Sequence, residues 1–113
     1  MPETLTTISA DELKDALEGE HPPVLINALP RAAHEARHIP GSVNVPVEEA
    51  DQIEALVPNK DEPIVVYCAN ADCTASPKLA QKLEEMGYTN VADFEDGYAG
   101  WRRAGHPLVG TEA

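Results

Sequence analysis

Short continuous runs of apolar residues alternate along this chain with segments whose apolar residues recur every three or four positions. The runs are typical of strands buried on both faces of a sheet, and the wider spacing is typical of amphipathic helices. Core strands are therefore predicted at 24–26, 64–67 and 91–94, with weaker candidates at 6–8 and 43–47. Strands separated by helices indicate βαβ units and a parallel sheet that helices cover on both faces.

Capping and turn residues indicate where the intervening helices begin and end. Ser9 precedes two acidic residues and predicts an N-cap, and Ser76-Pro77 predicts a helix start with serine as the N-cap. Gly87 follows the apolar stripe of that second helix and predicts its end. Further helices are expected over residues 31–37, 48–57 and 98–103.

The composition is that of one globular domain spanning residues 1–113. Hydrophobic residues make up 42% of the chain and charged residues 25%, which is enough for a core without disulfides or metals. Residues 1–4 and 110–113 lack an apolar period and are expected to fray. The two cysteines could form one disulfide, but a chain of this size does not need one, and a reducing compartment would leave both thiols available for chemistry.

Acidic residues outnumber basic ones by 20 to 8, and the formal net charge is −12. This charge argues against nucleic acid and anionic membranes as partners. A small anionic substrate would need backbone N–H groups or a helix N-terminus to hold it. The first residues have neither the basic region nor the apolar run of a leader, and no segment approaches the roughly 20 apolar residues of a membrane span. A cytoplasmic location is therefore expected.

Cys68 is the strongest candidate for a reactive residue, because it directly follows the predicted strand at 64–67. Ligands of parallel α/β sheets bind beyond the carboxyl ends of the strands. The small and polar loop at 69–75 could turn N–H groups toward the sulfur, and the next helix would add its positive end. Both effects lower the pKa of a thiol, and the thiolate is the nucleophile. From position alone, a buried and inert cysteine is an equally good interpretation.

Five groups of residues occur in order along almost the whole chain: Val24-Leu25-Ile26, His38-Ile39-Pro40-Gly41-Ser42 with Asn44 and Pro46, Ile64-Val65-Val66-Tyr67-Cys68, Gly87-Tyr88-Thr89-Asn90-Val91, and Glu95-Asp96-Gly97 with Trp101. Together they resemble the landmarks of a rhodanese-like domain. The resemblance implies an α/β fold with a five-stranded parallel sheet, helices on both faces, and no metal or organic cofactor. It also implies that Cys68 is catalytic, takes sulfane sulfur from thiosulfate or another persulfide, and passes it to a thiol or cyanide.

The chain departs from the family pattern around this cysteine. Asn27 and Leu29 stand where many members carry aspartate and arginine, and the loop after Cys68 is longer than usual and lacks glycine and arginine. Anion binding would then depend on the amides of residues 69–73 and on a helix dipole worth only ~0.3–1 kcal/mol when exposed. Weak thiosulfate affinity is therefore expected.

The longer loop is also similar to that of the phosphatase and arsenate-reductase relatives of the fold. Those enzymes hold an oxyanion with two parallel hydrogen bonds from a loop arginine. No arginine lies between Arg37 and Arg102, so phosphatase activity is not expected.

Cys73 lies in the same loop as Cys68, and a subset of the family is similar in having two cysteines followed by a serine, here Ser76. Three functions are open for Cys73: a resolving thiol that forms a reversible disulfide with Cys68, a second station in a sulfur relay, or half of a soft-metal site. A small buried residue without a function is a fourth interpretation. Two thiolates leave zinc short of its usual four ligands, so no metal site is predicted.

The expected substrate-binding loop consists of Ala69, Asn70, Ala71, Asp72, Cys73, Thr74 and Ser76. Asp72 is expected to point to solvent. Thr74 and Ser76 could donate hydrogen bonds to a bound sulfur species, although helix capping would explain both equally well. His38 is expected to hold its turn through backbone hydrogen bonds rather than to act as a base.

The leading hypothesis is therefore a rhodanese-type sulfurtransferase with a Cys68 persulfide. Its expected partners are a small sulfur-containing donor and a thiol acceptor, with a sulfur-relay protein as a further candidate. The alternative is a non-catalytic rhodanese module that binds a protein or senses thiol–disulfide redox state through Cys68 and Cys73.

Overall fold

The strands form one sheet of five, and every neighbouring pair is parallel, as predicted. The computed structural model describes residues 6–113. The sheet order is β1-β5-β4-β2-β3. The strands are β1 (Thr6–Thr7), β2 (Val24–Asn27), β3 (Val43–Asn44), β4 (Ile64–Tyr67) and β5 (Val91–Phe94). The longer apolar runs thus became the three central strands, and both edge strands are short.

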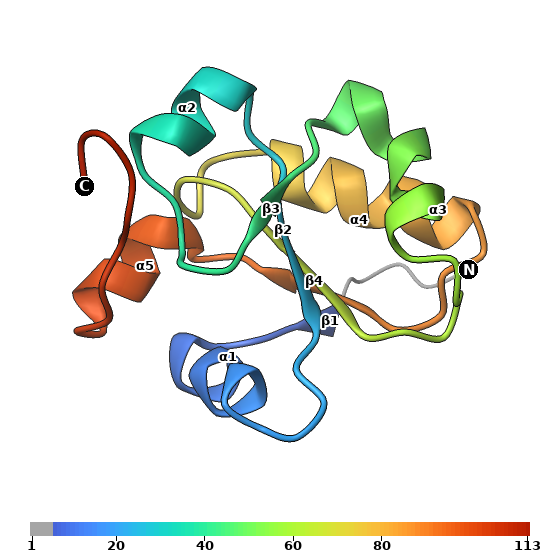
Figure 1. The fold of residues 1–113 in the computed structure, drawn as a ribbon, viewed down its shortest axis with the longest axis horizontal. Coiled ribbons are helices and arrows are strands. Elements are labelled where there is room, and N and C mark those ends of the chain that lie inside the picture. Colours follow the sequence, from blue (N-terminus) through green and yellow to red (C-terminus); the bar gives the residue numbers. More distant parts are fainter. Residues whose placement is uncertain (1–5) are drawn as a thin grey trace.

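Helices cover both faces of the sheet and enclose two separate apolar cores (Figure 1). One core joins the sheet to α1 (Ala10–Leu17) and α5 (Gly97–Arg103), through Leu13 and Trp101. The other joins the sheet to the segment at 47–56 and to α4 (Ala75–Glu85), through Ile53 and Leu79. The helices are α1 (Ala10–Leu17), α2 (Arg31–Ala36), α3 (Ile53–Leu56), α4 (Ala75–Glu85) and α5 (Gly97–Arg103), and none in residues 6–113 is long and apolar enough to cross a membrane.

The segment between β3 and β4 differs from the prediction. The strand expected at 43–47 ends at Asn44, because Pro46 has no N–H to donate to a ladder and the chain turns there. The single α-helix expected at 48–57 is instead a 3₁₀ segment, η1 (Val47–Gln52), followed by the one-turn helix α3. Glu49 interrupts the helical backbone with φ −110° and ψ 20°. Apolar residues three apart fit a 3₁₀ turn as well as an α-turn, so the spacing did not distinguish them.

Of the two predicted N-caps, the structure confirms the one at Ser9 and contradicts the one at Ser76. Ser9 caps α1 as expected: its hydroxyl accepts from the Glu12 N–H at 3.1 Å, and its own N–H donates to the Glu12 carboxylate at 2.9 Å. The predicted Ser76 N-cap is wrong, because α4 begins at Ala75 and Ser76 is buried in the first turn. Gly87 ends α4 as predicted, with φ +103°.

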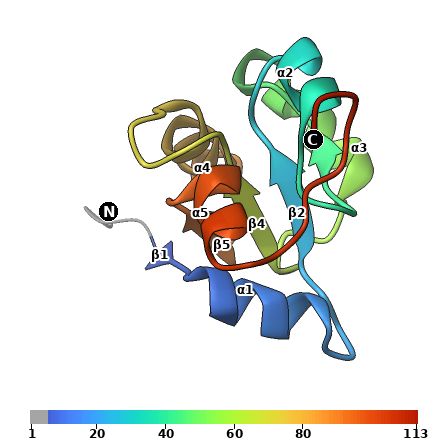
Figure 2. The ribbon, with the colours of Figure 1, turned by 90° about the vertical axis from the view of Figure 1, so that its left-hand side faces the viewer.

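The C-terminal residues lie against α2, in contrast to the frayed end expected from the sequence (Figures 1 and 2). The Thr111 N–H donates to the Glu35 carbonyl at 3.0 Å, and the Glu112 N–H donates to the Ala36 carbonyl at 2.8 Å. Gly110 permits this contact because its φ is +131° and a side chain would meet the α2 backbone. The expectation of fraying at residues 1–4 lies outside the described residues.

Gly97 lets α5 approach the loop that follows β4. Its φ is +66°, and a β-carbon there would lie 2.6 Å from the Asn70 nitrogen. Two hydrogen bonds join α5 to the loop at this point. The Tyr98 N–H donates to the Cys68 carbonyl at 2.9 Å, and the Ala99 N–H donates to the Ala69 carbonyl at 3.0 Å. The first turn of α5 therefore holds the beginning of the loop.

Replacing Gly97 with alanine should destabilise the domain more than a positive φ alone explains. We expect Gly97→Ala to lower the free energy of unfolding in urea by about 2–4 kcal/mol, from backbone strain plus steric clash. Gly105→Ala is the matched control, because φ is +96° there and no atom lies within 4 Å of the added carbon. It should cost roughly 1 kcal/mol. Equal losses in the two variants would show that the approach of α5 is not tight.

Candidate functional site

Cys68 lies at the carboxyl end of the central strand β4, where the sequence places it. Its residue surface is 1% exposed, and all four residues of β4 before it are buried. Residues 69–74 form the loop between this strand and α4. The strand end therefore holds the sulfur at the edge of the sheet where ligands of parallel α/β folds bind.

Cys68 and Cys73 form a disulfide across the loop, with their Cα atoms 6.4 Å apart. This distance lies within the range of ordinary disulfides. Cys73 is partly exposed, whereas Cys68 is buried. The loop therefore brings the two sulfurs together, as the resolving-thiol hypothesis requires. Within residues 6–113 no group of three or more His, Cys, Asp or Glu side chains could hold a metal ion.

Asn70 organises the loop from within. Its side-chain oxygen accepts from the Asp72 N–H at 3.0 Å, and its carbonyl accepts from the Cys73 N–H at 3.2 Å. Such local bonds are typical of asparagine in turns. Two of the five amides expected to cradle an anion, those of Asp72 and Cys73, are thus hydrogen-bonded inside the loop in this disulfide form, and an anion cradle at residues 69–73 stays a prediction. Asp72 itself is exposed, as expected.

Ser76 is the loop-side hydroxyl that reaches the sulfur. Ser76 is 1% exposed, and its Oγ lies 3.5 Å from Cys68 Sγ. Thr74 is exposed and stands at the N-cap position without a side-chain hydrogen bond. Of the two hydroxyls considered from the sequence, the structure therefore brings only Ser76 to Cys68. A hydroxyl in this position can donate a hydrogen bond to a thiolate.

Asp93 is a buried carboxyl group beside Ser76 that the sequence analysis missed. It lies on β5 and is only 3% exposed. Burial raises the pKa of Asp93, a hydrogen bond with Ser76 opposes that rise, and the negative charge of Glu95 adds to it. The available signal was an acidic residue inside a run predicted to be a buried strand, since aspartate is rarely buried without a partner.

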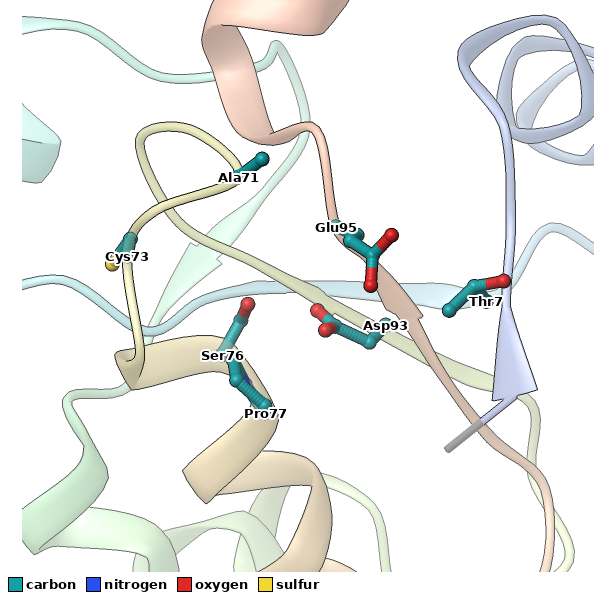
Figure 3. A pocket seen from close by; sticks show the side chains of 7 residues that line it. All are labelled: Thr7, Ala71, Cys73, Ser76, Pro77, Asp93 and Glu95. Carbon is teal, nitrogen blue, oxygen red and sulfur yellow. The ribbon is translucent and has the colours of Figure 1, made fainter. Parts of the chain in front are cut away.

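A pocket of about 360 Å³ opens between this carboxyl group and the loop (Figure 3). The carboxylates of Asp93 and Glu95 lie on one side of it, and Ser76 and Cys73 lie on the other. The residues that line it are Thr7, Ala71, Cys73, Ser76, Pro77, Asp93 and Glu95. The pocket beside the disulfide loop is therefore acidic, and no lysine or arginine in the described part of the chain lines it.

The neighbouring strand end and turn have structural functions. Asn27, at a position where the resemblance to rhodanese-like domains implies an aspartate, is fully buried and accepts from the Leu29 N–H at 2.9 Å. His38 Nδ1 lies 2.6 Å from the His34 carbonyl oxygen, and the His38 N–H donates to the Val109 carbonyl at 2.8 Å. The expectation that His38 holds its turn is confirmed.

Comparison with known proteins gives a consistent family. Residues 9–104 match the model of the rhodanese-like domain. The HTH-type transcriptional regulator Rv0324 of Mycobacterium tuberculosis is 35% identical over 85 residues, which cover 74% of this chain and 36% of the regulator. The thiosulfate sulfurtransferase PspE of Escherichia coli is 37% identical over 59 residues, which cover 51% of this chain and 55% of that protein.

The fold agrees with that of a solved relative. The solution structure of the rhodanese-like domain of the Alr3790 protein from Anabaena superposes with a TM-score of 0.82 at 25% identity, over 96% of this chain and 82% of that one. The matched segment amounts to 36% of the regulator and 55% of the sulfurtransferase, so the chain spans only part of each of these curated relatives. The match over residues 9–104, together with the shared five-stranded parallel sheet, shows that this chain belongs to the rhodanese-like domain family.

Proposed function

We propose that this domain is a sulfurtransferase in which Cys68 carries sulfane sulfur as a persulfide. The observation that carries the proposal is the position of Cys68, at the end of β4, beside the Ser76 hydroxyl and within bonding reach of Cys73. Membership of the rhodanese-like family and the similarity to a thiosulfate sulfurtransferase support the same activity. The 1% exposure of Cys68 would limit access of water to a sulfur atom held there.

In the proposed reaction, the Cys68 thiolate attacks the sulfane sulfur of the donor. With thiosulfate, the sulfur–sulfur bond of the donor breaks, sulfite leaves with the bonding electron pair, and Cys68 becomes a persulfide. An acceptor thiolate then attacks the outer sulfur, which leaves as the persulfide of the acceptor and restores the Cys68 thiolate. Cyanide as acceptor gives thiocyanate by the same displacement. The Ser76 hydroxyl has one proton, so it would donate to the sulfur that bears the negative charge when it is not donating to Asp93.

Cys73 is the resolving thiol in this scheme. Its thiolate attacks Sγ of the Cys68 persulfide, the outer sulfur leaves as hydrosulfide, and a Cys68–Cys73 disulfide forms. The disulfide of the structure would be the product of this step. Two external thiols restore the reduced pair and leave as one disulfide. A protein that delivers or receives the sulfur remains a candidate partner.

A second candidate function is a redox or protein-binding module without sulfur transfer. The disulfide itself favours it, because an oxidant can form the same bond from the two thiols with no persulfide involved. The similarity to a transcriptional regulator is consistent with a sensing domain. The two candidates predict different masses on Cys68.

Mass spectrometry of the reduced protein after treatment with thiosulfate or a small persulfide tests the first proposal. Cys73→Ser should accumulate an adduct of about 32 Da, one sulfur atom, because the resolving thiol is absent. The adduct should be absent from Cys68→Ala. The wild type should form the adduct transiently and then lose about 2 Da relative to its reduced mass as the disulfide closes. A disulfide that forms in the wild type while no variant forms an adduct with any donor would favour the second candidate.

A loop cation should improve the use of thiosulfate. We expect a high KM for thiosulfate, since the loop lacks arginine and the adjoining pocket is acidic. Ala71→Arg should raise kcat/KM for thiosulfate about fivefold, the effect of roughly 1 kcal/mol between opposite charges about 4 Å apart in water. Ala71→Gln controls for side-chain size at this exposed position. A low KM in the unmodified protein, or equal rates in the two variants, would contradict the argument.

A further inference from the structure

We propose that the pocket beside the loop binds the positively charged group of a small aminothiol, or of its persulfide, which reacts with the cysteine pair. The carboxylates of Asp93 and Glu95 would bind this positively charged group. The inference rests on the proposed function, because it names the class of thiol that exchanges sulfur with Cys68. No such acidic subsite is needed for an anionic donor such as thiosulfate.

The first observation is a buried acceptor without a partner. Asp93 is 3% exposed, and its Oδ1 has no hydrogen-bond partner among residues 6–113. Buried polar atoms are nearly always hydrogen-bonded, because leaving one unpaired costs free energy. Asp93 lines the pocket, and Figure 3 shows its carboxylate at the pocket wall. A ligand that donates to Oδ1 would remove this cost.

The second observation is the charge around that oxygen. Asp93 and Glu95 are two residues apart, so their side chains leave the chain on the same side at the end of β5. Their carboxylates face the same pocket, and the charge of Glu95 acts on Asp93. The seven lining residues include no lysine or arginine to compensate for these charges. An ammonium group supplies both the missing donors and the opposite charge.

The third observation is the distance from the pocket to the sulfurs. Ser76 and Cys73 line the pocket, and Ser76 Oγ lies 3.5 Å from Cys68 Sγ. A ligand whose ammonium group sits at Asp93 therefore has Cys73 across the pocket, and Cys68 lies next to Ser76 without lining the pocket itself. The volume of about 360 Å³ is near the lower end of the range for small-molecule sites. Together these features fit a small molecule that carries an ammonium group close to its sulfur.

The reaction of such a thiol with the disulfide is a balanced exchange. The ligand thiolate attacks Sγ of Cys73, the more exposed of the two cysteines, and Cys68 leaves as the thiolate. A second ligand thiolate attacks the sulfur of the first ligand in the mixed disulfide, and Cys73 leaves as the thiolate. Two ligand thiols are oxidised to one disulfide, and the protein disulfide is reduced to two thiols. The persulfide of the same ligand would deliver its outer sulfur to Cys68 from the same position.

The test compares small thiols that differ in charge as reductants of the oxidised protein. Cysteamine is cationic, 2-mercaptoethanol is neutral and 3-mercaptopropionate is anionic, and the rate of each is expressed per thiolate present. The measured quantity is the ratio of the cysteamine rate to the 3-mercaptopropionate rate. In the wild type this ratio should exceed that on a small uncharged disulfide by about fivefold or more, as expected for one close charge pair in water.

Glu95→Gln and Asp93→Asn should each lower that ratio about threefold to fivefold. Glu85→Gln is the matched control, because it removes the same charge from an exposed position at the end of α4 that does not line this pocket. It should change the ratio only slightly, because a distant surface charge is screened. Glu95 is exposed, so Glu95→Gln decides the question even if Asp93→Asn fails to fold.

Equal ratios in Glu95→Gln, Glu85→Gln and the wild type would overturn the proposal, and so would a wild-type ratio no higher than that on the small disulfide. These rates do not depend on persulfide formation. A protein that forms no Cys68 persulfide can still prefer cysteamine, and one that forms it can lack the preference. The inference and the proposed function can therefore fail separately.

Discussion

The pairing of β4 with both of its neighbours is the constraint on which the site depends. β4 is hydrogen-bonded to β2 on one side and β5 on the other, in parallel, along all four of its residues. The register sets Tyr67 opposite Asn27 and Phe94, so the three strands end at one level. Cys68 and Glu95 are the next residues of their strands and therefore emerge side by side. A shift of one residue in either pairing would turn every side chain of the moved strand to the other face.

The loop itself is held at both ends. The first turn of α5 binds the carbonyls of Cys68 and Ala69, and the first turn of α4 buries Ser76. Between these fixed points the Asn70 turn and the bond to Cys73 shape the loop. Helix α5 thus binds the first backbone carbonyls of the loop, and helix α4 supplies the Ser76 hydroxyl beside Cys68. Reduction of the disulfide would remove one of these restraints.

Local patterns predicted those features of the fold that local chemistry determines. The apolar runs gave the three central strands, and the end of the 64–67 run gave the position of Cys68. The segment at 47–56 was predicted incorrectly, because apolar spacing does not separate a 3₁₀ turn from an α-turn. Ser76 was assigned to the wrong position because a serine before a proline signals a helix start without showing which turn residue is the cap.

The remaining parts of the site could not be predicted because they depend on contacts between distant segments. Asp93 meets Ser76 only because β5 pairs with β4 and α4 packs beside them, and no local pattern records that meeting. The disulfide depends on how tightly the chain curls between Cys68 and Cys73, which side-chain composition alone does not determine. The family resemblance supplied the interpretation of Cys68, and the departures from the family pattern pointed to the loop as the part that differs.

The burial of Cys68 would affect the rate at which a bound sulfur atom is released. A sulfur atom carried on Cys68 as proposed would lie below the surface, because Cys68 is 1% exposed, and a bulky nucleophile would reach it only after the loop moves. The lifetime of such a cargo would be set by how often the loop opens rather than by the reactivity of the sulfur–sulfur bond. Slender thiols would react with the bound sulfur quickly, and a branched thiol of equal basicity would react only when the loop opens. The shape of the acceptor molecule would then determine how quickly the sulfur is released.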